Sequence, residues 1–464
     1  MTLPVGFVVR VARGVRIRDR GRTLIGGAPL RVVRLGPAAR RILSRGKLVV
    51  SEPAAGVLAE RLLTSGVAEP VVDALPPVPL DDVTCVVPVH DRVDALDRLL
   101  ESLDRRVRVL VVDDASHASQ EVRRVVERHG ASLIRREING GPAAARNTGL
   151  AQVRTPLVLF VDSDVVVSEQ TLRHLARHFT DPKVALVAPR VRPLGDDRSV
   201  VGRYEAVCSS LDMGRRSALV RPLSAVSWVP SAAVMARRAA IGAGFDDAMR
   251  SGEDVDLAWR LISEGWRVRY DADVAVHHEH RTATMDWLAR KAFYGTSAAG
   301  LAARHGSAVA PAVVTPIQAL ISLSLLAQRR WSIPLGAALA SLVVVRTRAK
   351  LHRIERPGAV AAELTCGALM ATSRQMSQLL LRHWWPLAAV ASVRSRRMRR
   401  AVVVCAVVQS LVDFRRHEPN LDPLRFALTA RLDDLAYGVG LWRGVIRSRS
   451  VAALRPRWAA TAMR

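Results

Sequence analysis

The chain has little cysteine and little lysine for its 464 residues. Its four cysteines lie far apart and form no Cys-x-x-Cys pair, which argues against a structural zinc site and a disulfide framework and favours a reducing compartment. The start, MTLPVGFVVRVARG, has no basic segment ahead of an apolar core, so we expect no secretory signal and a catalytic part in the cytoplasm. Almost all basic residues are arginine, which together with the abundant Ala and Val reflects genome composition rather than selection for phosphate binding.

Acidic residues are scarce at the two ends of the chain, although the formal net charge is +27. Residues 1–75 carry 13 basic and 5 acidic side chains, residues 76–300 carry 31 and 30, and residues 301–464 carry 25 and 7. A nucleic-acid-binding protein should carry its positive charge on its largest folded region, so the nearly neutral middle argues against a nucleic-acid partner. We expect the basic C-terminal region to face an anionic membrane surface at the cytoplasmic side of the cell membrane.

Residues 1–75 predict a small winged-helix-like module. The sequence indicates short strands and then two helices, at Val15–Asp19, Thr23–Ile25, Leu30–Leu35, Pro37–Ser44 and Ala54–Thr64. The proline-rich residues 76–82 then predict a linker.

Residues 83–300 predict an α/β domain of the nucleotide-binding type. Three continuous apolar runs alternate with amphipathic stretches, and these runs are Val83–Val89, Val107–Val112 and Pro156–Val161. Short buried strands separated by helices (here 93–103 and 119–129) are typical of a parallel sheet made of βαβ units. The binding site of such a sheet lies at the carboxyl ends of its strands.

Acidic residues stand at the end of each of these strands. The sequences are His90-Asp91, Asp113-Asp114 and Asp162-Ser163-Asp164. Carboxylates that meet at one sheet edge repel each other, so a divalent cation, a bound nucleotide or both explain them best. A single Asp-x-Asp is weak evidence, because strands often end on acidic residues, but three acidic strand ends in this order are much stronger.

Three further segments carry groups that can do chemistry. The glycine-rich entry NGGPAAARNTG at residues 139–149 lets a helix begin close to a ligand, with Arg146 available to phosphate or base. It is not a P-loop, and no GxGxxG follows the first strand, which disfavours NAD. Glu253 and Asp254 begin an amphipathic helix, where Asp254 is either a general base or a helix cap. The run His277-His278-Glu279-His280 ends a strand at residues 268–276, and the oxygen-rich context suggests Mg²⁺ or Mn²⁺.

The C-terminal region, residues 301–464, is expected to be helical, basic and partly apolar. Gly306–Gln328 is uncharged over 23 residues and is long enough to span a bilayer, whereas Trp331–Val345, at 15 residues, is short for a span. Arginine clusters such as residues 394–400 flank further apolar runs. Two interpretations stay open: a helical bundle packed on the catalytic domain, and a membrane-embedded or interfacial helical hairpin.

Taken in order, the motifs VVPVHDR, VVDDAS, NGGPAAARNTG, LFVDSD and GEDVDLAWRL resemble those of the family 2 glycosyltransferases with the GT-A fold. The resemblance covers about residues 83–280, and the ordered set is more specific than any one motif. With the N-terminal module and the segment RKAFYGTSAA at residues 290–299, the whole chain resembles the mycofactocin-system glycosyltransferases. This resemblance implies an α/β GT-A domain, a winged-helix-like module similar to peptide-recognition domains, and an α-helical C-terminal region.

The same resemblance implies an inverting, metal-dependent transfer of glucose, as a β-1,4-linked oligosaccharide, from UDP-glucose to a peptide-derived redox cofactor precursor. Asp254 would be the catalytic base. His90 and Asp91 would lie near the base pocket, where the commoner pattern has a Tyr-Asn pair. The other residues with implied roles are Asp113 at the uracil, Arg146 near the nucleotide, Asp162 at the ribose and the Mg²⁺ or Mn²⁺ ion, Asp164 and His278 on that ion, and His280 behind His278.

Two alternatives remain from the sequence. The apolar C-terminal segment also fits a family 2 transferase that builds a lipid-linked or cell-envelope glycan. The basic N-terminal module also fits a peptide-binding or nucleic-acid-binding protein with an inactive transferase domain, although Asp162, Asp164 and Asp254 are all present.

Overall fold

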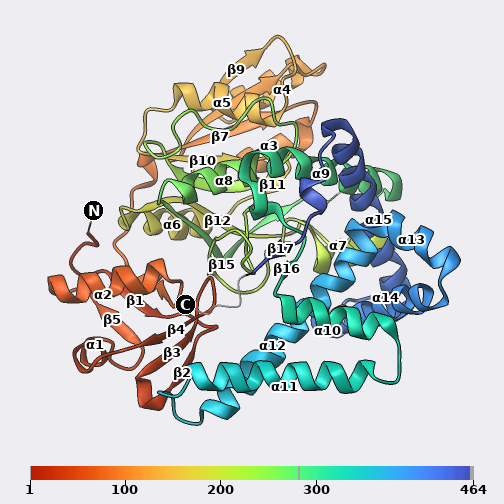
Figure 1. The fold of residues 1–464 in the computed structure, drawn as a ribbon. Helices are drawn as coiled ribbons and strands as arrows, with labels where there is room; N and C mark the ends of the chain where they lie inside the picture. The colour runs from red at the N-terminus through yellow and green to blue at the C-terminus, as the bar shows by residue number, and fades with distance from the viewer. Residues whose placement is uncertain (1, 281–282, 460–464) are drawn as a thin grey trace. The chain divides into compact units, whose positions relative to one another are not determined.

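A computed structural model describes residues 2–280 and 283–459 (Figure 1). The chain forms two compact units. The first consists of Met1–Asp196 and Ser209–His280, and the second of Asp197–Cys208 and Arg281–Arg464.

The N-terminal part of the first unit contains two small antiparallel sheets and two helices. Its elements are β1 (Val8–Val11), β2 (Arg16–Arg18), β3 (Thr23–Gly26), β4 (Arg31–Arg34), α1 (Pro37–Ile42), β5 (Lys47–Val49), α2 (Pro53–Thr64) and β6 (Ala68–Pro70). One sheet has the order β5-β1-β6 and the other β2-β3-β4. This module has its own hydrophobic core, which extends from Leu3 to Leu75 and includes the buried face of α2. The strands and helices expected between residues 15 and 64 are confirmed, whereas β1, β5 and β6 were not predicted.

A large mixed sheet forms the rest of the first unit (Figure 1). Its strand order is β11-β15-β12-β14-β10-β7-β8-β9, and β13 pairs with β15. The strands are β7 (Val83–Val89), β8 (Arg108–Asp114), β9 (Ser132–Arg136), β10 (Leu157–Val161), β11 (Val165–Val166), β12 (Val184–Pro193), β13 (Ala218–Leu219), β14 (Ala233–Arg237) and β15 (Arg267–His278). Strands β10, β7, β8 and β9 run parallel, as expected. Beyond β10 the sheet becomes mixed, because β14 is antiparallel to both β10 and β12.

Helices cover this sheet. They are α3 (Val93–Ser102), α4 (Ser119–Arg128), α5 (Pro142–Gln152), α6 (Glu169–Arg177) and α8 (Glu253–Ser263). Every residue of β7 is buried, which fits its continuous apolar sequence. Helix α5 approaches the sheet closely because it has no side chain at Gly149, where a Cβ would overlap Val86 Cγ1. The small residues of this segment thus bring the start of α5 to the strand ends.

The second unit is helical. Its elements are α7 (Val200–Cys208), α9 (Thr284–His305), β16 (Val313–Val314), α10 (Pro316–Ala327), α11 (Ser332–Lys350), α12 (Pro357–Gln378), a π-helical turn (Leu379–His383), α13 (Trp385–Arg394), α14 (Arg396–His417), α15 (Pro423–Ser448) and β17 (Arg457–Trp458). Helices α9 and α15 pack backbone to backbone, since a Cβ on Gly440 would overlap the carbonyl oxygen of Ala292. A buried Lys291 ammonium joins three helices through Glu205 Oε1 at 2.9 Å and Asp433 Oδ2 at 3.1 Å.

The uncharged run Gly306–Gln328, long enough in sequence to span a bilayer, does not form one continuous helix. A 3₁₀ turn (Gly306–Val309) and β16 occupy its first half, and α10 begins only at Pro316 behind a capping box of Thr315 and Gln318. Proline cannot donate the backbone hydrogen bond that a continuous helix needs, and two prolines interrupt this run. In the described part of the chain, one helix is long and apolar enough to cross a membrane, and it is α11, whose uncharged run had been expected to be short for a span.

Candidate active site at the strand ends

The acidic strand ends predicted from the sequence meet at one edge of the sheet. Strand β8 pairs in parallel with β7 so that Asp113 lies opposite Val89, directly before His90 and Asp91. Strand β10 lies on the other side of β7, and Asp162 and Asp164 follow its last residue. The carboxylates therefore lie at the carboxyl ends of neighbouring parallel strands, where the ligand-binding crevice of such a sheet lies.

Asp113 is fully buried and is held by two donors. Its Oδ2 pairs with Arg135 Nη1 at 2.5 Å, and its Oδ1 accepts a hydrogen bond of 2.9 Å from the backbone N–H of Ser116. These bonds fix the orientation of the carboxylate. Arg135 comes from β9, the next strand of the sheet, so nothing in the local sequence of Asp113 reveals this partner.

His90 and Asp91 lie in the turn after β7, and Asp91 contacts His117. Asp91 Oδ1 accepts from the backbone N–H of His117 at 2.6 Å and of Ala118 at 3.1 Å, and its Oδ2 lies 2.7 Å from His117 Nδ1. The side-chain bond to His117 and these backbone bonds lower the pKa of Asp91 to about 2. His90 Nδ1 lies 2.9 Å from the carbonyl oxygen of Asp114. The two residues predicted near the base are thus fixed to the end of β8 and the turn after it.

Asp114 holds the glycine-rich loop, a role that was not predicted from the sequence. Its Oδ1 accepts from the backbone N–H of Gly140 at 3.1 Å, and its Oδ2 from that of Gly141 at 2.7 Å. Gly141 has φ +85°, a conformation that side chains rarely adopt, and it is the residue before α5. Asp114 therefore sets the position at which α5 begins.

Arg146 connects the end of β10 with the start of α8. It is almost completely buried, with Nη2 at 2.5 Å from Asp162 Oδ1 and Nη1 at 3.1 Å from Glu253 Oε1. A buried guanidinium needs such partners, because an unpaired buried charge is strongly destabilising. The three predicted segments (residues 139–149, 162–164 and 253–254) are thereby brought together.

Asp254 lies beside Glu253 in the first turn of α8. Its Oδ1 accepts from the backbone N–H of Val255 at 2.8 Å, and its Oδ2 accepts from that of Ser231 at 3.3 Å. Burial and the neighbouring charge of Glu253 raise the pKa of Asp254 to about 7, against an ordinary value of 3.8. A carboxylate with a pKa near neutrality is suited to accept a proton from a hydroxyl group.

Asp164 and His278 lie together at the same edge of the sheet. His278 Nε2 lies 3.4 Å from Asp164 Oδ1, and Arg92 Nη1 lies 2.8 Å from Asp164 Oδ2. Asp164 Oδ1 is buried and has no hydrogen-bond partner. An imidazole nitrogen and an unsatisfied carboxylate oxygen at this separation fit a divalent cation, whose neighbouring ligands lie about 3 Å apart.

The structure does not gather every predicted metal ligand into one set. Within residues 2–280 and 283–459, the trios of His and Asp whose ligand atoms all lie within 4.8 Å of one another are His90–Asp91–His117 and His174–His178–Asp271. Asp162 instead pairs through one oxygen with Arg146. The contributions of Arg92, Arg135 and His117 were not predicted, because each meets its partner only through the fold.

Comparison with known proteins identifies the family. The family model described as glycosyl transferase family 2 matches residues 84–241. The chain is 46% identical, over 98% of its own length and 98% of the relative's, to the pre-mycofactocin glycosyltransferase of Mycobacterium tuberculosis. It is 23% identical to the poly-β-1,6-N-acetyl-D-glucosamine synthase of Staphylococcus aureus over 38% of this chain and 44% of that protein.

A solved mannosyltransferase of Pyrobaculum calidifontis, in complex with GDP-Man and Mn²⁺, matches 64% of this chain and 89% of its own at 20% identity and a TM-score of 0.39. The full-length match at 46% identity, together with the family model, carries the assignment. The chain is an enzyme that belongs to the mycofactocin-system glycosyltransferases of glycosyl transferase family 2, with the GT-A fold.

Proposed function

We propose that the protein transfers glucose from UDP-glucose to the peptide-derived mycofactocin precursor, with inversion at the anomeric carbon, and that repeated transfer builds a β-1,4-linked oligosaccharide. The observation that carries the proposal is the position and pKa of Asp254. This carboxylate is partly exposed beside the strand ends, and its pKa of about 7 makes it an effective base near neutral pH. The donor sugar and the linkage come from the resemblance to the family.

In this proposal Asp254 accepts the proton of the acceptor hydroxyl as the oxygen attacks the anomeric carbon from the face opposite the diphosphate. Arg146 holds Asp162 and Glu253 in place. His90 and Asp91 bind the base. The predicted contact of Asp113 with the uracil is replaced by a positioning role, because its buried carboxylate is held by Arg135 and the Ser116 N–H. Asp164 and His278 would hold a Mg²⁺ or Mn²⁺ ion, which supplies the charge that stabilises the leaving diphosphate. Arg146 occupies Oδ1 of Asp162, which leaves Oδ2 for the ribose or the ion.

A groove in the N-terminal module supports a peptide-derived acceptor. It has a volume of about 580 Å³ and is lined mainly by residues of β4 and α2, with Ala39 of α1 at its edge. Strand β4 lies at the end of its sheet, so its outer backbone groups can pair with an extended peptide. Val33, Leu58 and Leu62 give the groove apolar walls, and the exposed Arg34 and Arg61 favour acidic residues in the peptide.

A pair of charge reversals tests this part of the proposal. Arg34→Glu should raise the KM for the peptide-derived acceptor and leave the KM for UDP-glucose unchanged. Arg41→Glu is the matched control, since Arg41 is exposed on α1 and does not line the groove. Equal effects of the two substitutions on the acceptor KM would contradict a role for the groove.

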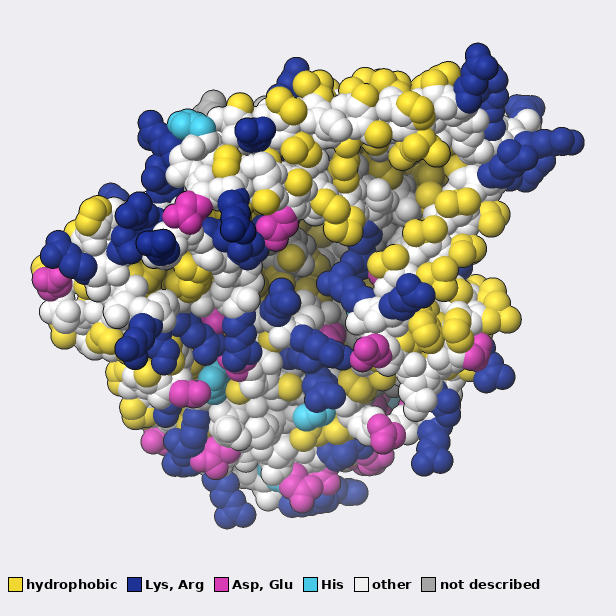
Figure 2. Space-filling view, turned by 90° about the horizontal axis from the view of Figure 1, so that it is seen from below, with side chains coloured by type: hydrophobic (Ala, Val, Ile, Leu, Met, Phe, Trp, Pro, Cys, Tyr) yellow, Lys and Arg dark blue, Asp and Glu magenta, His cyan; other side chains and the backbone are white. Residues whose placement is uncertain are grey.

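We also propose that the helical unit binds the cytoplasmic face of the membrane. Figure 2 shows exposed hydrophobic side chains gathered beside arginines. Only Ser332 and Gly336 of α11 are buried, and Ile333 at its start is 75% exposed. Helix α14 begins with RRMRR and carries exposed apolar residues at helical spacing, which are Val403, Val404, Val407, Val408 and Leu411. An apolar stripe with arginines at its end is typical of a helix that lies in an anionic membrane surface.

The same exposed helices favour the second candidate, a transferase acting on a lipid-linked or cell-envelope glycan. Incubation of the purified protein with UDP-glucose and either the peptide-derived precursor or a polyprenyl phosphate separates the two. We expect hexose addition to the precursor. Addition to the polyprenyl lipid alone would contradict the proposed acceptor.

A further inference from the structure

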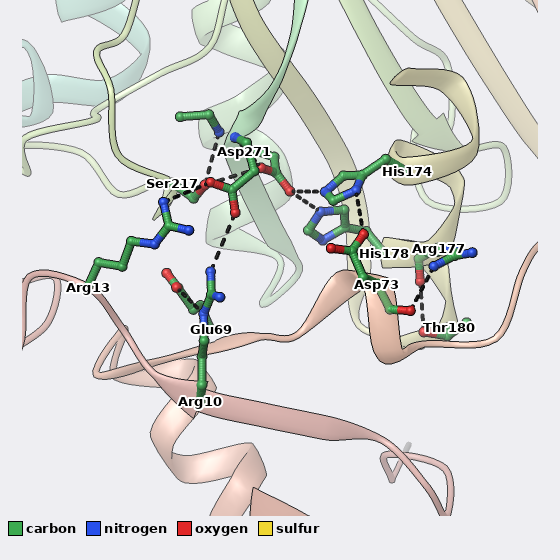
Figure 3. Close-up of polar contacts among 12 residues, drawn as sticks. Arg10, Arg13, Glu69, Asp73, His174, Arg177, His178, Thr180, Ser217 and Asp271 are labelled. Atoms are coloured by element: carbon green, nitrogen blue, oxygen red, sulfur yellow. Dashed lines mark hydrogen bonds and ion pairs between the residues drawn. The ribbon is translucent and has the colours of Figure 1, made fainter. Parts of the chain in front are cut away.

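A second cluster of histidine and carboxylate side chains lies at α6 and β15, beside the N-terminal module (Figure 3). His174 and His178 are four positions apart, so both imidazoles project from the same side of the helix and the turn that continues it. Their Nε2 atoms lie 3.1 and 2.7 Å from one atom, Oδ2 of Asp271. His178 and Asp271 are each only 3% exposed.

The arrangement has the geometry of a three-ligand metal site. All three ligand atoms lie within 4.8 Å of one another. Ligands bonded to a tetrahedral zinc ion at about 2.0–2.2 Å lie roughly 3.4 Å apart, so a shift of the side chains by a few tenths of an ångström would admit the ion. A cavity of about 30 Å³ is lined by these residues and gives room for one ion or water.

The surrounding groups support two of the three ligands, Asp271 and His174, as an outer shell of a metal site does, whereas the buried Nδ1 of His178 has no hydrogen-bond partner among the described residues. Asp271 Oδ1 accepts from Ser217 Oγ at 3.1 Å and from the backbone N–H of Asp273 at 2.9 Å, which fixes the carboxylate plane. Asp73 Oδ1 lies 3.3 Å from His174 Nδ1, the nitrogen that faces away from the proposed ion. Metal-bound histidines usually donate this second N–H to a carboxylate, a backbone carbonyl or water.

The charge of the cavity also favours a cation. Four carboxylates line it, and they are Glu69, Asp73, Asp271 and Asp273. They outnumber the two guanidinium groups in the lining, Arg10 and Arg269. Arg10 pairs with Glu69 at 2.7 Å and Arg13 pairs with Asp273 at 3.0 Å. Asp73 and Asp271 are therefore the lining carboxylates that balance Arg269 and favour a cation.

We propose that His174, His178 and Asp271 bind one divalent transition-metal ion, Zn²⁺ by preference. Two imidazoles and one carboxylate are a ligand set that selects such ions over Mg²⁺, and three protein ligands leave a fourth position for water. This site is separate from the strand-end site and does not depend on the proposed function. Asp73 comes from the end of the N-terminal module, so the ion would stabilise the packing of that segment against α6 (Figure 3).

The test measures bound zinc in the full-length protein. Four proteins are dialysed against micromolar Zn²⁺ with excess Mg²⁺: wild type, His174→Ala, Asp271→Asn and the control His129→Ala. Mass spectrometry then gives the number of zinc ions bound per chain. His129 is a suitable control because it forms a similar pair, 2.7 Å from Asp97 of α3, at the end of α4. We expect wild type and His129→Ala to retain one zinc ion per chain more than the two cluster variants, and zinc to raise their melting temperature.

A second measurement needs no variant and so is independent of any folding defect. The zinc X-ray absorption spectrum of the wild-type protein should show an oxygen and nitrogen shell with two imidazoles and no sulfur. Equal zinc content in wild type and His174→Ala, or a wild-type spectrum without two imidazoles, would overturn the proposal.

Discussion

Burial and then the charge of Glu253 raise the pKa of Asp254 from 3.8 to about 7, which corresponds to roughly 4 kcal/mol of preference for the neutral carboxyl group. A base must be ionised to accept a proton, so kcat/KM should rise with pH and level off above about 7. Because the pKa of the folded state lies above the unfolded value, the same proton stabilises the fold below pH 3.8, and this stabilisation is lost as the pH rises through 7.

The perturbation that tests this reasoning is Glu253→Gln. The substitution removes the charge beside Asp254 but leaves Asp254 buried, and burial is the larger cause of its raised pKa. The acidic limb of the kcat/KM–pH profile should therefore move to lower pH by roughly one unit. Glu264→Gln is the matched control, since Glu264 is an exposed carboxylate at the other end of α8.

The assay is sugar transfer followed by mass spectrometry at a series of pH values. Asp254→Asn should lose transfer by at least about 100-fold, because general base catalysis contributes on the order of 10² to 10⁴ in rate. The assignment of Asp254 as the base would be refuted if Glu253→Gln left the acidic limb of the kcat/KM–pH profile unchanged. It would also be refuted if Asp254→Asn kept both that limb and the wild-type rate of transfer.

Three further predictions concern the metal, the helical unit and the membrane. Asp164→Ala and His278→Ala should each weaken activation by Mn²⁺ by roughly 10- to 100-fold in a metal titration. The control His277→Ala, on the alternate face of β15, should not weaken it. Equal Mn²⁺ titrations of all three variants would show that Asp164 and His278 are not ligands of the ion. Gly440→Ala should lower the melting temperature sharply, because it forces a Cβ against the carbonyl of Ala292. The control Gly367→Ala, in α12 with open space around it, should raise the free energy of unfolding by about 0.5–1 kcal/mol. Similar effects of the two substitutions would contradict the close packing of α9 and α15. Val407→Asp should reduce binding to anionic lipid vesicles in a sedimentation assay. The control Val57→Asp, which replaces a similarly exposed valine of the N-terminal module, should not reduce it. Full vesicle binding by Val407→Asp would show that this face of α14 does not contact the membrane.

Much of the strand-end site could be predicted from the sequence because its signals are local. Apolar runs ending in Asp113 and Asp162 predict buried parallel strands with carboxylates at one edge, and the structure has both. The glycine-rich entry to α5 is local as well. The start of α8 at Glu253 follows from the acidic residues in its first turn.

The parts that could not be predicted depend on contacts between distant segments. The pairs Arg135–Asp113 and Arg92–Asp164 join residues 22 and 72 positions apart, and no spacing rule predicts them. The cluster around Asp271 forms between α6 and β15 in the same way. The absence of charge over Gly306–Gln328 does not reveal how the run is divided, because its prolines separate a short strand from the helix that begins at Pro316.

The central claim is that this protein glycosylates a peptide-derived precursor with Asp254 as the base. The most direct test is mass spectrometry of that precursor after incubation with UDP-glucose and either wild-type protein or Asp254→Asn. We expect a ladder of hexose increments with wild type and an unmodified precursor with Asp254→Asn. An unmodified precursor with wild type, or the same ladder with Asp254→Asn, would contradict the proposed function.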